Sequence, residues 1–140
     1  MVDHSFMETR GNGAKMIKGG CFCGAIRYEI DDVDYTVLNC HCSMCRRASG
    51  APYVTWVVAR VENFHLTKGE PTVLESSKEG SRHFCNLCGT PVTCMNTSHP
   101  DVIDVTLCSL DDPSAMKPTR EFHADAGLDW VSDLSGLATN

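Results

Sequence analysis

The stretch GGCFCGAIRYEI, residues 19–30, combines a cysteine pair with a strand pattern. Cys21 and Cys23 are separated by one residue, and from Ile26 to Ile30 apolar side chains alternate with charged ones. Alternation with a period of two is typical of a half-buried strand. The stretch therefore predicts a strand that begins beside two potential metal-ligating thiols.

Short β-rich segments of this kind recur along the chain. Turn sequences such as KGEP and NTSHPD separate seven further ones, at residues 35–39, 53–61, 63–68, 71–76, 91–95, 102–107 and 120–125. One helical turn is expected at residues 43–48 and another near Asp111. We therefore expect a mainly β fold of antiparallel sheets with few short helical turns.

The length of 140 residues fits one domain with its own core. Residues 1–16 are polar and aperiodic, which predicts a flexible N-terminal tail. Residues 17–135 are expected to form a single zinc-binding domain.

Composition limits the classes of partner. The 18 acidic residues outnumber the 12 basic ones, the formal charge is −6, and no run of Lys or Arg marks a nucleic-acid surface. The most apolar run, residues 53–61, is far shorter than the roughly 18 residues of a membrane span, and the N-terminus has no apolar signal core. We expect a cytoplasmic protein that binds neither nucleic acid nor membranes.

Nine cysteines in a chain without an export signal favour metal binding over disulfides. Cys94 and Cys108 stand alone in strand-like segments and are expected to be buried apolar side chains. The other seven form three clusters: Cys21 and Cys23, then Cys40, Cys42 and Cys45, then Cys85 and Cys88.

Two of the clusters predict a structural zinc site. Cys85-x-x-Cys88 has the spacing of a zinc knuckle, and Gly89 can close its turn. Cys21 and Cys23 lie about 60 residues earlier, on an expected neighbouring hairpin, so a four-cysteine site would join the start of the domain to its middle. Iron also accepts four thiolates, but nothing in the sequence indicates electron transfer, and zinc is predicted.

Cys40, Cys42 and Cys45 then have to bind a second ion. Zinc with three protein ligands keeps a fourth position for water or substrate, as catalytic sites do. His41 stands between two of these cysteines and is expected to face outward. A structural site stays open as an alternative, with the fourth ligand coming from His41, His83, Cys94 or Cys108.

The ligand set also indicates the chemistry. Three thiolates leave Zn²⁺ with a net charge of −1, so the ion activates water less than a three-histidine zinc does. A thiol bound at such an ion is deprotonated and held as a nucleophile. We infer that the substrate carries sulfur.

Three motifs, in their order and spacing, resemble the glutathione-dependent formaldehyde-activating enzyme family: GGCFCGAIRYEI, CHCSMCRRASGAPYVTW and RHFCNLCGTPV. The resemblance extends from about Ile17 to Trp130 and implies the β-tent fold. It also implies two zinc ions per chain. Cys21, Cys23, Cys85 and Cys88 would hold the structural ion, and Cys40, Cys42 and Cys45 the catalytic one.

The activity implied by the resemblance is that of a carbon–sulfur lyase, an S-(hydroxymethyl)glutathione synthase that joins glutathione to formaldehyde. Arg46 and Arg47 directly follow the third cysteine, and we expect them to bind a carboxylate of glutathione because an arginine fork suits that group. Ser43, His41 and His83 are candidate proton donors.

A second class of function stays open, because the family also includes a centromere protein and a fold with its metal does not fix a substrate. The alternative is a non-catalytic, zinc-stabilised module that binds a protein. Three retained cysteines in the second site and the lack of a basic or low-complexity extension favour the enzyme. The sequence leaves a homodimer open.

Overall fold

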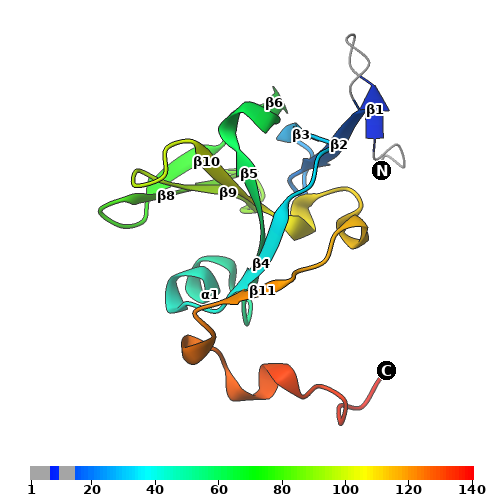
Figure 1. The fold of residues 1–140 in the computed structure, drawn as a ribbon, viewed down its shortest axis with the longest axis vertical. Helices are drawn as coiled ribbons and strands as arrows, with labels where there is room; N and C mark the ends of the chain where they lie inside the picture. The colour runs from blue at the N-terminus through cyan, green and yellow to red at the C-terminus, as the bar shows by residue number, and fades with distance from the viewer. Residues whose placement is uncertain (1–6, 10–14) are drawn as a thin grey trace.

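The computed structural model describes residues 7–9 and 15–140, and its strands form two sheets (Figure 1). The strands are β1 (Met7–Thr9), β2 (Lys15–Gly20), β3 (Arg27–Asp31), β4 (Thr36–Cys40), β5 (Val54–Arg60), β6 (Phe64–Lys68), β7 (Thr72–Glu75), β8 (Gly80–Phe84), β9 (Pro91–Asn96), β10 (Val102–Thr106) and β11 (Arg120–Phe122). The helices are α1 (Ser43–Ser49) and the 3₁₀ turns η1 (Val61–Asn63), η2 (Leu107–Ser109), η3 (Pro113–Ala115), η4 (Ala124–Ala126) and η5 (Asp129–Ser132).

The smaller sheet has the strand order β1-β2-β3-β6, and the larger one β11-β4-β5-β10-β9-β8-β7. Neighbouring strands are antiparallel except β11, which runs parallel to β4. This arrangement confirms the expected mainly β fold, and α1 confirms the expected helical turn. No helix in the described part of the chain is long and apolar enough to cross a membrane.

The larger sheet buries side chains on both of its faces. Val57 of β5 is fully buried in the main core, which also contains Tyr28 and Ile30 of the smaller sheet. Its neighbour Trp56 points the opposite way, into a second cluster with Leu38 and Cys45. Because successive strand residues face opposite sides, β5 separates the main core from the cluster that contains Cys40 and Cys45.

Strand pairing and burial are also found before residue 17, where the domain was expected to begin. β2 starts at Lys15, Met16 is fully buried, and β1 pairs with β2 across Met7–Thr9. Burial of Met16 and ladder pairing supply stabilisation that the polar composition did not reveal. The remaining residues of the predicted tail, 1–6 and 10–14, lie outside the described residues.

Two local expectations differ from the structure. β8 is not among the strands expected from the sequence, because it owes its strand character to pairing with both β7 and β9. Cys108 is exposed in η2, so the prediction that it is buried is wrong, whereas Cys94 is half-buried in β9. The chain turns out of the sheet directly after Thr106, which takes Cys108 away from the core.

Candidate metal centres

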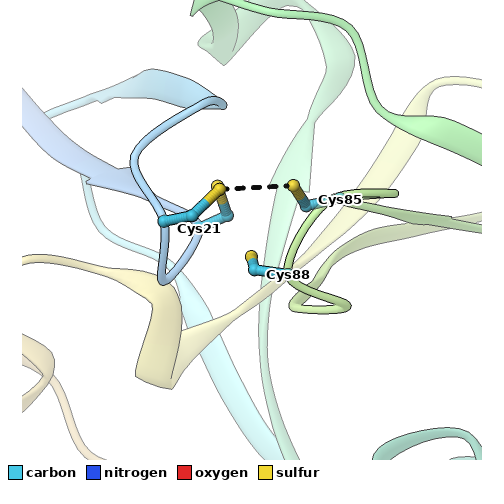
Figure 2. Close-up of side chains that lie close together, drawn as sticks. Cys21, Cys85 and Cys88 are labelled. Carbon is cyan, nitrogen blue, oxygen red and sulfur yellow. Dashed lines mark hydrogen bonds between the residues drawn. The ribbon is translucent and has the colours of Figure 1, made fainter.

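The four-cysteine group joins two loops that lie far apart in sequence. Cys21 and Cys23 follow β2, while Cys85 and Cys88 follow β8. Their four sulfur atoms lie within 4.8 Å of one another. Figure 2 shows the side chains of Cys21, Cys85 and Cys88 directed toward a common point. The group therefore connects the smaller sheet to the larger one.

The sulfur spacing tests whether a zinc ion fits here. A tetrahedral zinc with Zn–S bonds of about 2.3 Å places its sulfur ligands about 3.8 Å apart. The Cys21 and Cys23 sulfurs are 3.6 Å apart, and those of Cys23 and Cys85 are 3.7 Å apart. These distances fit the edges of a zinc tetrahedron.

The loops also place hydrogen-bond donors against two of the sulfurs, those of Cys21 and Cys88. The Ile26 backbone N–H donates to the Cys21 sulfur at 3.2 Å. Hydrogen bonds from Thr90, whose hydroxyl lies 3.2 Å from the Cys88 sulfur, lower the pKa of the Cys88 thiol to about 5. Gly89 has a φ of 83°, a value that favours glycine and completes the turn expected after the knuckle.

The three-cysteine group lies at the junction of β4 and α1. Cys40 ends β4, Cys42 is the N-cap of α1, and Cys45 lies in its first turn. The Cys42 sulfur accepts a hydrogen bond from the Cys45 backbone N–H at 3.3 Å, so a thiol takes the place of the usual oxygen at this cap. The three sulfurs lie within 4.8 Å of one another, close enough to share one zinc ion.

Charge in this group is concentrated on Cys45. A hydrogen bond with Cys40, followed by one from Arg82, lowers the pKa of the Cys45 thiol to about 5, and the same bond with Cys45 raises the pKa of Cys40. The Arg82 guanidinium donates to the Cys45 sulfur at 3.5 Å. Arg82 stands in the third sequence motif, three residues before Cys85, but nothing in one sequence shows that its side chain reaches the other cysteine group.

Two cavities reach Cys45. One, of about 300 Å³, is lined by apolar side chains including Trp56, together with Arg82 and His83. The other is a groove of about 600 Å³ that also contains Cys40 and Asp104. Burial, followed by the charge at Cys45, raises the pKa of Asp104 to about 6. The three-cysteine group therefore borders space that a small molecule can enter.

His41 is buried, so the expectation that it faces outward is wrong. β11 runs beside the end of β4, the His41 backbone N–H donates to the Phe122 carbonyl at 3.0 Å, and the Glu121 carboxylate bonds the ring Nε2. The centroids of the His41 and Tyr53 rings are 5.1 Å apart. The C-terminal segment thus covers this residue, which sequence spacing alone could not show.

None of the alternative fourth ligands belongs to the three-cysteine group as the structure describes it: His41, His83, Cys94 and Cys108 lie outside the set of mutually close ligand atoms. His83 lines the smaller cavity, and its ring nitrogens bond the hydroxyls of Ser81 at 3.1 Å and Thr93 at 2.7 Å.

Arg46 is half-buried and Arg47 is exposed, and neither lines a cavity that reaches Cys45.

Comparison with known proteins agrees with this geometry. The family described as "Glutathione-dependent formaldehyde-activating enzyme" matches residues 16–126, a span that contains both cysteine groups. The chain belongs to this family. The resemblance drawn from the three motifs is therefore confirmed.

A relative of the same family name comes from Halomonas elongata and is described as a "putative glutathione-dependent formaldehyde-activating enzyme". It is 28% identical over 127 residues, which cover 83% of this chain and 80% of the relative. A crystal structure of a Rhodobacter sphaeroides protein has 25% sequence identity and a TM-score of 0.59, and the match covers 75% of this chain and 99% of that one. That likeness supports the same fold.

Proposed function

We propose that this family member is a zinc-dependent carbon–sulfur lyase that acts on adducts of thiols with small aldehydes. The leading reaction is the formation of S-hydroxymethylglutathione from glutathione and formaldehyde. The observation that carries the proposal is the open three-cysteine group, whose Cys40 and Cys45 line a groove of about 600 Å³. Sites for small ligands commonly measure about 300–1,000 Å³.

The two cysteine groups suit different tasks. The four-cysteine group supplies all the ligands that a tetrahedral zinc requires, as structural sites do. The three-cysteine group supplies one fewer. A zinc ion held by Cys40, Cys42 and Cys45 would keep one position for the sulfur of a substrate and lower the pKa of that thiol.

The chemical step joins the thiolate sulfur to the carbonyl carbon of formaldehyde. A carbon–sulfur bond forms, the electron pair of the C=O π bond moves to oxygen, and the alkoxide takes a proton to become the hydroxyl of the product. Alignment of the two reactants in the groove supplies much of the acceleration. The reverse sequence breaks the same bond, which makes the reaction that of a lyase.

Among the three candidate proton donors, one lines a cavity that reaches Cys45. Ser43 and His41 line neither cavity that reaches Cys45, whereas His83 lines the smaller one. Its ring is held by Ser81 and Thr93, which fixes the orientation that proton transfer requires. We therefore propose His83 as the donor among the three candidates.

Exchange NMR of glutathione with formaldehyde tests the proposal. The rate with the zinc-loaded protein is compared with the spontaneous rate and with that of Cys42→Ser. We expect acceleration by the native protein and a return to the spontaneous rate in the variant, since serine keeps the helix cap but removes the sulfur ligand. Equal rates with and without native protein would refute this reaction and direct attention to a protein-binding module.

A further inference from the structure

The groove beside the three-cysteine group contains three charged side chains among the described residues that line it. They are Arg82 on β8, Asp104 on β10 and Arg120 on β11. Apart from the metal-ligating candidates Cys40 and Cys45, two positive charges and one negative charge face this space, and the other lining residues carry no formal charge. The groove therefore suits a ligand with two negative groups and one positive group.

Strand register explains why these charges share one face. Asp104 pairs with Cys94 on β9, and Cys94 pairs with Arg82 on β8. Because directly paired residues point to the same face of a sheet, the three side chains form one row across three strands. At a strand spacing of about 4.8 Å, the Cα atoms of Asp104 and Arg82 are separated by about 10 Å.

Neither charged side chain in the row forms a salt bridge with another charged residue in the described part of the chain, and Arg82 shares its charge with the Cys45 sulfur. In the described part of the chain, the Asp104 carboxylate makes no hydrogen bond or salt bridge, although His99 adds a weaker, longer-range attraction. Arg82 bonds only the Cys45 sulfur there and has no carboxylate partner. A guanidinium has five N–H donors, so Arg82 keeps several for a ligand.

We propose that Asp104 binds the α-ammonium group of glutathione and that Arg82 and Arg120 bind its two carboxylates. This inference rests on the proposed function and assigns the ligand's recognition to residues outside the cysteine groups. Glutathione carries one ammonium and two carboxylates, the complement of the groove's three charges. Arg46 and Arg47, the arginines expected from the sequence, are not needed for this arrangement.

The length of glutathione and the position of its thiol agree with the row formed by Asp104, Cys94 and Arg82. Three residues in extended form span about 10 Å, which matches the separation of Asp104 and Arg82. Arg82 also contacts Cys45, so a carboxylate bound to it lies close to the open metal site. The proposed arrangement has the glycine end of glutathione at Arg82, its thiol at the three-cysteine group and its γ-glutamyl end between Asp104 and Arg120.

Calorimetric titration of zinc-loaded protein with S-methylglutathione tests the assignment without a free thiol that could bind the metal. For Asp104→Asn we expect about ten-fold weaker binding, the loss of one charge-assisted contact. An S-methylglutathione that lacks the α-ammonium group should bind the native protein about ten-fold more weakly and show no further loss in Asp104→Asn. Arg120→Gln should weaken S-methylglutathione by a similar factor.

Asp34→Asn is the matched control, because Asp34 is exposed in the turn before β4 and does not line the groove. It should bind S-methylglutathione as the native protein does. The assignment is overturned if Asp104→Asn binds like the native protein, if its loss persists for the ligand without the ammonium, or if the native protein binds no S-methylglutathione.

The exchange-NMR rate of the same variants separates this inference from the proposed function. Acceleration by the native protein that is equally strong in Asp104→Asn at low glutathione would overturn the recognition site and leave the lyase reaction intact. Charge-dependent binding of S-methylglutathione without acceleration would support the recognition site and reject the reaction.

Discussion

The two cysteine groups differ in the length of chain that they connect. The four-cysteine group joins loops that follow β2 and β8, whereas the three-cysteine group lies within the six residues between Cys40 and Cys45. Both groups border cavities, since Cys21 and Cys23 line one of about 820 Å³ and Cys45 lines two. They differ in the number of thiols, four in one group and three in the other. The comparison teaches that one ligand chemistry can stabilise a fold in one place and leave a reactive position in another.

The largest expected effect is on folding stability, which should differ between variants of the two cysteine groups. Cys85→Ser should leave the protein unfolded at room temperature, because a structural zinc contributes about 10 kcal/mol or more, comparable with a whole domain's stability of about 5–15 kcal/mol. Cys42→Ser, the matched variant in the other group, should keep a native near-ultraviolet circular dichroism spectrum. Two variants that unfold to the same extent would contradict the division of tasks.

Removal of zinc should distinguish the two cysteine groups by their rates of release. A zinc chelator added to the native protein should take one ion rapidly from the three-cysteine group, which leaves one zinc position without a protein ligand, and the other slowly, with unfolding, from the four-cysteine group. A colorimetric zinc indicator measures both phases while tryptophan fluorescence reports unfolding. Release of both ions in a single phase coupled to unfolding would show that the groups are not independent.

Loss of the contact between Glu121 of β11 and His41 should have a smaller effect on stability. Glu121→Gln weakens the bond to the buried His41 ring, and we expect a loss of about 1 kcal/mol in the free energy of unfolding, measured in urea. Glu62→Gln is the control, because Glu62 pairs only with the exposed Arg60 and should change stability by less than about 0.5 kcal/mol. Equal losses of unfolding free energy in the two variants would argue against a specific role for the Glu121–His41 contact.

The smallest effect is expected at the arginine that follows the three-cysteine group. Arg47 is exposed and lines neither cavity, so Arg47→Glu should raise the KM for glutathione less than about three-fold, through screened, longer-range repulsion. Initial-rate kinetics at physiological salt measure this. A ten-fold or larger rise would return glutathione binding to Arg46 and Arg47, as the sequence predicted.

The division of seven cysteines into two groups could be predicted from the sequence. The spacing of Cys85 and Cys88 limits how far their sulfurs can separate, and alternation predicts strands such as Arg27–Asp31 without knowledge of their partners. Both properties are local, because they depend on backbone geometry over a few residues. The motifs around the cysteines were also sufficient to indicate the family.

Only the tertiary structure decided which residues meet from distant strands. Burial of His41 depends on β11, some 80 residues later, and the meeting of Arg82 with Cys45 depends on the path of β8. The row of Asp104, Cys94 and Arg82 depends on register between strands, which no local pattern specifies. Sequence by itself determined the grouping of the cysteines and many of the strands, while packing of the sheets decided what surrounds the cysteines, since long-range contacts arise only when the whole core is buried.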